Sequence, residues 1–286
     1  MVILQSKCGR LGNRLIIFSH FIANAIHYRY RLFNPTFDEY TRWFPATRND
    51  DFGPYAVSVG GRGRLSCTAF ERLTYVAMKI APRSPWHAFI RWNGVRVFDL
   101  NDEAFLARAR DRATFMFGWM FRDYRHVDQY QDLIRGFFTP NPEILESVQR
   151  ASDAGRRTCD VLVGVHVRRG DFRTKNSRYC FDLAVYCDQM EQTARLLASA
   201  NRRVSFLVCS DEPVDRRDYP GLAVTPGPGG ATEDLYALSR CDYVMGPPSS
   251  FSMWASFYGR APRYWIRDPS QPVALDAFTR AWEEPV

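Results

Sequence analysis

The most constraining feature of this sequence is an uninterrupted apolar segment, residues 161–165 (VLVGV), followed at once by the polar segment 166–171 (HVRRGD). A strand that is apolar on both faces is typical of a parallel sheet covered by helices on both sides. In such sheets, ligands bind where the polar residues follow the carboxyl ends of the strands. The sequence therefore predicts an α/β fold with a ligand site directly after residue 165.

Strand-like and helix-like segments alternate along the rest of the chain. Residues 2–5 form a short apolar run, followed by the glycine-rich turn 9–13 (GRLGN) and a helical pattern with apolar residues at 15, 18, 21, 22 and 26. This order opens a Rossmann-like domain, in which the turn and the helix N-terminus can face an anion. Further strands are predicted at 95–98, 114–117, 204–208 and 243–245, and further helices at 142–149, at 181–200, through 235–238 and after Pro248.

We interpret this alternation as two Rossmann-like domains, residues 1–150 and 151–286, facing a central cleft in which a nucleotide sugar lies. The segment 50–64 is rich in Gly and Arg and is predicted to be a loop. No internal repeat or low-complexity segment interrupts the pattern.

Composition narrows the class of protein. Hydrophobic residues make up 46% and charged residues 24%, which is typical of a globular protein. The net charge of +7 favours anionic partners, but Arg alternates with Asp and Glu, so no nucleic-acid-binding stripe is expected. The seven cysteines form no C-x-x-C pair, so free, mostly buried thiols in a reducing compartment are expected and a zinc site is not. Without a signal peptide or membrane-spanning segment, a cytoplasmic protein with at most peripheral membrane contact is expected.

The strongest chemical motif is the pair Arg168 and Arg169 at the predicted strand end. Two adjacent guanidinium groups are costly to desolvate without an anion, so a diphosphate is the expected partner. The alternative is that both arginines form ion pairs with acidic residues on a neighbouring loop.

Two further segments also follow predicted strands. In residues 246–252 (GPPSSFS), hydroxyl residues open a helix whose free amide groups could bind phosphate, or Ser249 or Ser250 simply caps the helix. Asp211 could accept hydrogen bonds from a base such as guanine, or be an exposed loop carboxylate. The chain has neither a P-loop motif nor Asp-x-Asp, so leaving-group charge would be neutralised by arginine and by helix N-terminal amides rather than by a metal.

In their order, these motifs resemble those of the bacterial α1,2-fucosyltransferases and, more distantly, of the α1,6- and protein O-fucosyltransferases. The resemblance runs through nearly the whole chain and rests on the segments 9–13 (GRLGN), 117–119 (FGW), 166–171 (HVRRGD), 234–241 (DLYALSRC) and 249–254 (SSFSMW). The chain departs from the family at Met120-Phe121, where a Gln-Ser pair is common, and this difference falls on the expected acceptor side.

The resemblance implies a GT-B fold and an inverting, metal-independent transfer of L-fucose from GDP-fucose to a glycan hydroxyl, forming an α1,2 linkage. GDP-fucose is then a donor substrate and no cofactor is expected. The second partner is a carbohydrate acceptor, for which a galactose-terminated glycan is one candidate. The alternatives are a GT-B glycosyltransferase with another nucleotide sugar and a non-catalytic nucleotide-sugar-binding module.

By position in the motifs, Arg168 contacts the β-phosphate, His166 and Asp211 line the guanine pocket, and Asn13 approaches the fucose. The expected donor-binding residues are Arg10, Gly12, Asn13, His166, Arg168, Arg169, Asp211, Ser249, Ser250, Phe251 and Ser252. The expected catalytic residues are Arg168, which stabilises the leaving group, and Asp171, the first candidate for a base. Asp123 and His126 are alternative bases, and a base-free, dissociative path is the third option.

Overall fold

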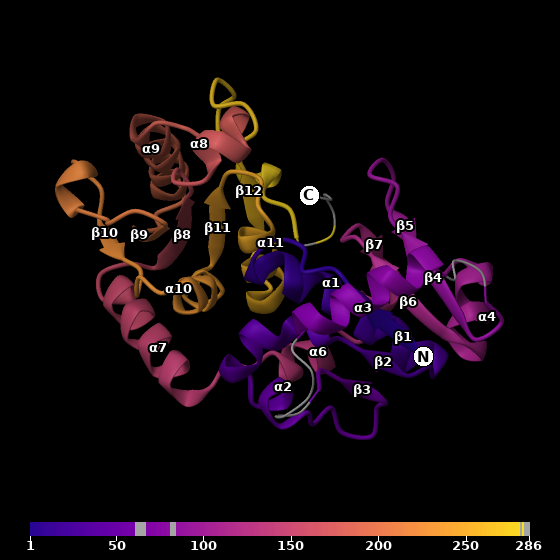
Figure 1. Cartoon of the computed structure of the whole chain (residues 1–286). Coiled ribbons are helices and arrows are strands. Elements are labelled where there is room, and N and C mark those ends of the chain that lie inside the picture. Colours follow the sequence, from indigo (N-terminus) through magenta and orange to yellow (C-terminus); the bar gives the residue numbers. More distant parts are fainter. Residues whose placement is uncertain (61–66, 81–83, 281, 283–286) are drawn as a thin grey trace. The chain divides into compact units, whose positions relative to one another are not determined.

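The computed structural model describes residues 1–60, 67–80, 84–280 and 282, and the chain divides into two compact units, Met1–Asn141 and Pro142–Val286 (Figure 1). Each unit contains its own five-stranded sheet. The division falls before the predicted boundary at residue 150, because helix α7 (Pro142–Arg156) spans that position as one element. Helix α7 packs on three strands of the second unit, so its residues belong to that unit.

The sheet of the second unit is parallel throughout, with the strand order β10-β9-β8-β11-β12. Its strands are β8 (Val161–Val167), β9 (Val204–Ser210), β10 (Val224–Pro226), β11 (Tyr243–Gly246) and β12 (Arg263–Trp265). Its helices besides α7 are α8 (Phe172–Lys175), α9 (Leu183–Ser199), α10 (Ala231–Leu238) and α11 (Ser250–Gly259), with short 3₁₀ turns at Ser177–Tyr179, Arg216–Asp218 and Leu275–Ala277.

Helices cover both faces of this sheet, as the apolar run predicted. Every residue of β8 is buried. On one face, Val163 and Val165 join a core with Tyr186 and Met190 of α9. On the other face, Leu162 lies against α7 and Gly164 lies against α10. Burial on two sides explains why β8 has no polar residue before His166.

The sheet of the first unit is also parallel, with the order β3-β2-β1-β6-β4, and a separate two-stranded ribbon pairs β5 with β7. The strands are β1 (Val2–Leu4), β2 (Leu32–Phe33), β3 (Val57–Ser58), β4 (His87–Arg91), β5 (Phe98–Asp99), β6 (Ala113–Phe117) and β7 (Phe121–Arg122). The helices are α1 (Leu11–Tyr28), α2 (Pro45–Asn49), α3 (Cys67–Ile80), α4 (Glu103–Asp111), α5 (Tyr124–Gln129) and α6 (Gln131–Phe137), and Pro35–Trp43 is a 3₁₀ segment.

Aromatic residues form much of the core of the first unit. The ring of Phe18 in α1 lies 5.3 Å from Phe37, 5.9 Å from Phe52 and 5.7 Å from Phe138. These rings come from segments far apart in the sequence and join α1 to the loop segments around it. The two parallel sheets, each with its own helices, confirm the predicted α/β class with two Rossmann-like units.

Two details of the first unit differ from the prediction. Residues 95–97 are not a strand: Oδ1 of Asn93 accepts hydrogen bonds from the amides of Val95 and Arg96 and closes a turn, so β5 begins only at Phe98. The predicted loop 50–64 contains the short strand β3, and its residues 61–64 lie outside the described residues.

Two expectations about the whole chain concern thiols and membranes. The six cysteines that can be described are free, as expected, but only Cys209 and Cys241 are buried. In the part of the chain that the structure describes, no helix combines the length and the apolarity needed to cross a bilayer.

Candidate functional site

The strand order of the second unit places two of the predicted motifs side by side. From β8 the chain continues to β9 on one side of the sheet, whereas from β11 it continues to β12 on the other side (Figure 1). At such a switch point the two outgoing loops diverge and leave a crevice at the carboxyl ends of the strands, where ligands bind in open α/β sheets. The loops that leave here are residues 166–171 and 246–252.

His166 joins these two loops. Its ring stacks on Phe251 of α11 with the ring centroids 4.7 Å apart. Burial, with a smaller effect from the charge of Arg168, lowers the pKa of His166 to about 3, so its imidazole is neutral. Its buried Nδ1 atom has no hydrogen-bond partner within the described residues. An unsatisfied buried nitrogen at a strand end is a group that a ligand can satisfy.

Arg168 is fixed by acidic neighbours and by the backbone. Its Nε and Nη2 atoms lie 2.9 and 2.8 Å from Oδ1 of Asp171, and Nε lies 3.6 Å from Oδ2 of Asp211. Its amide donates to the hydroxyl of Tyr186 in α9 at 3.3 Å. Within the described ranges no hydrogen bond or ion pair engages its Nη1 atom, and the guanidinium carbon lies 5.5 Å from the centroid of the Phe172 ring.

Arg169 of this loop and Arg173 of α8 form ion pairs with Glu212. Nε of Arg169 lies 3.6 Å from this carboxylate, and Nη2 of Arg173 lies 2.6 Å from it. Arg169 therefore makes the ion pair with a neighbouring loop that the alternative describes, whereas the short contacts of Arg168 are to Asp171 of its own segment. Binding of a phosphate by either arginine stays a prediction. Because carboxylates accompany these guanidinium groups, the site has little surplus charge, and an anion here would be held by the directions of the N–H groups.

Asp211 organises the loop after β8. Its Oδ1 atom accepts a hydrogen bond from the amide of Arg169 at 3.0 Å. Burial alone would raise the pKa of Asp211, but the amides of Arg169 and Gly170 and the charge of Arg168 outweigh burial and hold this pKa below its usual value. The carboxylate oxygens of Asp211 therefore already interact with these amides and with Arg168. The contact of Asp211 with guanine stays a prediction.

Helix α11 shows which of the predicted hydroxyl groups support the fold. Ser249 is its N-cap and accepts from the amide of Phe251 at 3.1 Å, so the capping alternative is confirmed for this residue. Ser252 is buried, donates to the carbonyl oxygen of Ser249 at 3.1 Å and accepts from Nε1 of Trp265 at 3.0 Å. Ser250 and Phe251 are the first two residues of α11, and both are only partly buried.

Asp234 was not identified from the sequence. This residue of α10 is buried, and its Oδ1 atom accepts from the amide of Gly229 at 2.8 Å. Burial raises its pKa to about 6, against the opposing hydrogen bond from Gly229. Its carbonyl oxygen accepts from Cys209, the register partner of His166. The sequence did contain a signal, because Asp234 is the first residue of the segment 234–241 on which the resemblance rests.

The predicted residues Arg10, Gly12 and Asn13 lie at the start of α1 in the first unit. Arg10 is the N-cap, and its side chain makes no capping hydrogen bond. The turn is held by Arg14, which is buried and donates to the carbonyl oxygens of Cys8 at 3.0 Å and Thr36 at 2.6 Å. The contact of this turn with fucose stays a prediction.

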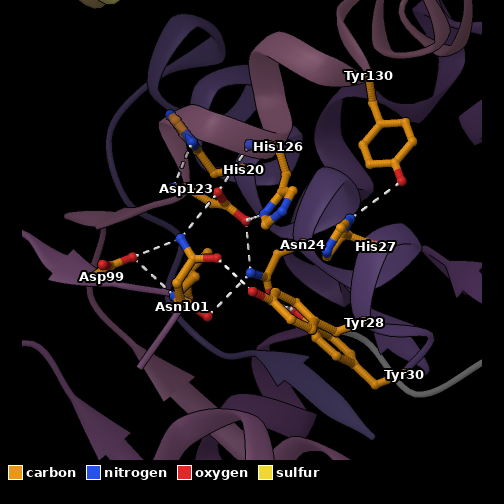
Figure 2. Close-up of polar contacts among 11 residues, drawn as sticks. His20, Asn24, His27, Tyr28, Tyr30, Asp99, Asn101, Asp123, His126 and Tyr130 are labelled. Atoms are coloured by element: carbon orange, nitrogen blue, oxygen red, sulfur yellow. Dashed lines mark hydrogen bonds and ion pairs between the residues drawn. The ribbon is translucent and has the colours of Figure 1, made fainter. Parts of the chain in front are cut away.

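The alternative bases Asp123 and His126 belong to a buried polar network, shown in Figure 2. Oδ2 of Asp123 accepts from Asn24 at 2.7 Å and lies 2.7 Å from Nδ1 of His126. Asn24 follows Asn13 by about three turns of α1, which corresponds to roughly 16 Å along the helix. These contacts join α1 to α5 away from the glycine-rich turn, so they give Asp123 a structural role.

No group of three or more His, Cys, Asp or Glu side chains within residues 1–60, 67–80, 84–280 and 282 is placed to hold a metal ion. Phe121, where the sequence departs from the related enzymes, is fully buried against Phe21 and Phe98. The departure at this position is therefore a feature of the core.

Comparison with solved structures shows three fucosyltransferase folds that cover most of this chain. A FUT1 variant from Arabidopsis thaliana in complex with GDP is similar with a TM-score of 0.63 and 13% identity, over 98% of this chain and 73% of that one. The NodZ α-1,6-fucosyltransferase soaked with GDP-fucose gives 0.56 and 16%, over 94% and 97%. POFUT1 in complex with GDP-fucose gives 0.53 and 14%, over 91% and 93%.

These likenesses show that the chain has the GT-B fold. No curated protein sequence gives a significant match. The model of glycosyl transferase family 11, by contrast, matches residues 110–262, which is more than half of the chain and includes β8 to β11 with both loops of the switch point. The chain therefore belongs to glycosyl transferase family 11.

Proposed function

We propose that this protein transfers L-fucose from GDP-fucose to a hydroxyl group of a carbohydrate acceptor and forms an α1,2 linkage. The observation that carries the proposal is Arg168, whose guanidinium is fixed at the switch point and whose Nη1 atom has no hydrogen bond or ion pair within the described residues. Family membership supports glycosyl transfer. The GDP and GDP-fucose complexes of the structural neighbours support the donor. The α1,2 linkage is supported by the order of the sequence motifs alone.

In the proposed reaction, the bond between fucose C1 and the β-phosphate oxygen breaks, and its electron pair stays on that oxygen. The acceptor hydroxyl forms the new bond to C1 from the opposite face and releases its proton to water. The Nη1 edge of Arg168 stabilises the growing charge on the phosphate. A donor placed where charge develops lowers the barrier more than one that binds the ground state equally well.

The remaining loop residues bind and position the donor in this proposal. Oδ1 of Asp171 contacts both Nε and Nη2 of Arg168. These contacts support a role for Asp171 in orienting the guanidinium rather than in taking the proton from the acceptor hydroxyl. The Nδ1 atom of His166, which has no partner within the described residues, is available for a hydrogen bond with the donor. The buried carboxylate of Asp234 is a second candidate, besides Asp211, for contact with guanine.

The donor is tested by thermal unfolding with GDP, UDP, ADP and CMP. A ligand present at 100 times its Kd stabilises the folded protein by about 2.7 kcal/mol, so GDP should raise Tm more than the other nucleotides at equal concentration. Product analysis with GDP-fucose and an acceptor panel then tests transfer, and NMR of the product tests the linkage. A larger shift with UDP would indicate another donor, and donor binding without any product would indicate a binding module.

A further inference from the structure

The second candidate site lies in the first unit, where β6 pairs with β1 on one side and with β4 on the other. A pocket of about 640 Å³ opens at the carboxyl ends of β1, β6 and β4, and it is lined among others by Ser6, Gly118 and Arg91. This volume lies within the range of about 300–1,000 Å³ that is usual for small-ligand sites.

The wall of this pocket is aromatic and held in place. Nε1 of Trp92 donates to the carbonyl oxygen of Arg96 at 2.7 Å, and the ring of Trp119 stands edge-on to Trp92 at 6.3 Å. Gly118 has a φ of +126°, and a Cβ atom there would lie 2.5 Å from Cβ of Trp92. Only glycine therefore lets the end of β6 pass so close to Trp92. Tyr75 of α3 also lines the pocket and is 48% exposed.

The charged side chain in the described lining is that of Arg91, a donor, and the uncharged polar side chains are those of Ser6 and Asn93, whose oxygen atoms accept from backbone amides. Arg91 ends β4 and is exposed, and within the described residues its guanidinium has no ion-pair or hydrogen-bond partner. No Asp or Glu is among the described residues that line the pocket. Aromatic rings that pack on a flat apolar face, combined with a guanidinium that binds oxygen atoms, fit a pyranose ring.

We propose that this pocket binds a sugar ring of the acceptor, which packs on Trp92 and Tyr75 while Arg91 donates hydrogen bonds to its oxygen atoms. This inference rests on the proposed function, which assigns the nucleotide to the second unit and leaves the other substrate for this pocket. The geometry points to Tyr75, Arg91 and Trp92 as residues that determine acceptor specificity.

Direct sugar binding tests the pocket without the donor. The probes are lactose and a glucuronate-terminated disaccharide, and their binding to the full chain is measured by saturation-transfer NMR. Tyr75→Ala and Trp92→Ala should each weaken binding about tenfold or more, as expected for aromatic anchors. Trp86→Ala is the matched control, because Trp86 lies in the same unit, is 81% exposed and does not line the pocket.

Arg91→Gln shows which oxygen atoms the guanidinium binds. Selective loss of the glucuronate probe identifies an acidic sugar, and an equal loss of both probes identifies hydroxyl groups. Tyr75→Ala is the variant that keeps the test valid if Trp92→Ala does not fold, since the Tyr75 side chain is half exposed. Binding of neither probe to the wild type, or wild-type binding by Tyr75→Ala, overturns the proposal.

Activity separates this inference from the function on which it rests. A wild-type protein that binds the probes but transfers no fucose would refute the proposed function and leave the pocket assigned. A protein that transfers fucose, and whose Tyr75 and Arg91 variants keep a wild-type acceptor KM, would refute only the pocket. When both ideas are right, these variants raise the acceptor KM and leave GDP affinity unchanged.

Discussion

Arg168 and Arg169 are adjacent in the sequence, and the structure gives them different surroundings. Arg168 contacts Asp171 and Asp211 and donates its amide to Tyr186, whereas the Arg169 side chain reaches Glu212 at the edge of the loop. The Arg168 side chain is only 14% exposed, against 26% for Arg169. We therefore expect Arg168 to act on the phosphate and Arg169 to contribute mainly to the structure of the loop.

Replacement of Arg168 tests this difference. Arg168→Lys keeps the charge but loses the planar guanidinium, so it should not rescue function. Both Arg168→Lys and Arg168→Ala should lower kcat about 100-fold or more, by analogy with the loss of an oxyanion donor. GDP affinity should fall less, because other contacts to the nucleotide remain. Kinetics and calorimetry on protein shown to be folded by circular dichroism measure both quantities.

Arg169→Lys is the matched control and should keep most of kcat. Near-wild-type turnover of folded Arg168→Lys would contradict the role of Arg168. Asp171→Asn separates positioning from proton transfer: a loss of kcat that is the same at every pH indicates positioning, whereas loss of the acidic limb of the pH profile indicates a base.

The buried His166 makes stability depend on pH. Its folded-state pKa of about 3 lies below the usual value of 6.5. Below pH 6.5 the unfolded chain therefore binds a proton that the folded chain does not, and His166 lowers the free energy of unfolding by up to about 1.4 kcal/mol per pH unit as the pH falls. His166→Phe, which can keep the stack on Phe251, should show a shallower decline in urea unfolding between pH 6.5 and 4.

His20 is also buried and has a lowered pKa. Because both the wild type and His166→Phe contain His20, the difference between their stability profiles against pH reports His166 alone. Parallel profiles for the wild type and His166→Phe would contradict the assignment of a neutral buried imidazole.

At the scale of elements, the site depends on how closely the loop after β11 passes the end of β8. Gly246 has a φ of +151°, and a Cβ atom there would collide with the carbonyl oxygen of His166. Only glycine readily adopts this backbone conformation. The position of the α11 N-terminus beside His166 therefore depends on one residue without a side chain.

Gly246→Ala should destabilise the protein by about 2–4 kcal/mol, because steric overlap in a packed site adds to backbone strain. The matched control is Gly221→Ala in the same unit, where φ is +76° but no atom lies within 4 Å of the added methyl group. That control should cost only about 1–2 kcal/mol for the left-handed conformation. Urea unfolding measures both, and equal costs would show that contact with His166 is unimportant.

At the scale of the whole molecule, each unit has a five-stranded parallel sheet whose first strand, β8 or β1, is central. The orders differ beyond that strand, because β11 precedes the edge strand β12 in the chain whereas β6 follows the edge strand β4. A transferase with two substrates needs two binding sites. We assign the nucleotide to the crevice of the second unit and propose the acceptor sugar for the pocket of the first.

Because Arg168 and helix N-terminal amides stabilise the leaving group in this proposal, transfer should not need a divalent metal. Dialysis against EDTA should leave kcat within about twofold of its value, since no Lewis acid contributes to the barrier. The measurement is the initial rate of fucose transfer before and after EDTA, with Mn²⁺ added back to a parallel sample. Collapse of the rate in EDTA with recovery in Mn²⁺ would contradict the role of the arginine.

The sequence by itself determined the strand ends and the residue types at the site. The all-apolar run of β8 could be recognised because both faces of a central parallel strand are buried, and apolar patterning is a local property. The short strands β10 and β12 and the turn at residues 93–96 were missed, because so few residues carry too weak a pattern. The polar residues after β8 and before α11 followed from the same reasoning about strand ends.

Only the tertiary structure decided what each of these polar groups contacts. Packing of the loops decided that Arg168 pairs with Asp171. Packing of segments distant in the sequence decided that Asp211 accepts from the amide of Arg169 and that the buried Ser252 accepts from Trp265. Asp234 became a candidate only when α10 placed its carboxylate beside Gly229. The physical reason is that patterning fixes which residues are buried, whereas the partner of a buried polar group is set by the strand order, which brings together residues that no local pattern connects.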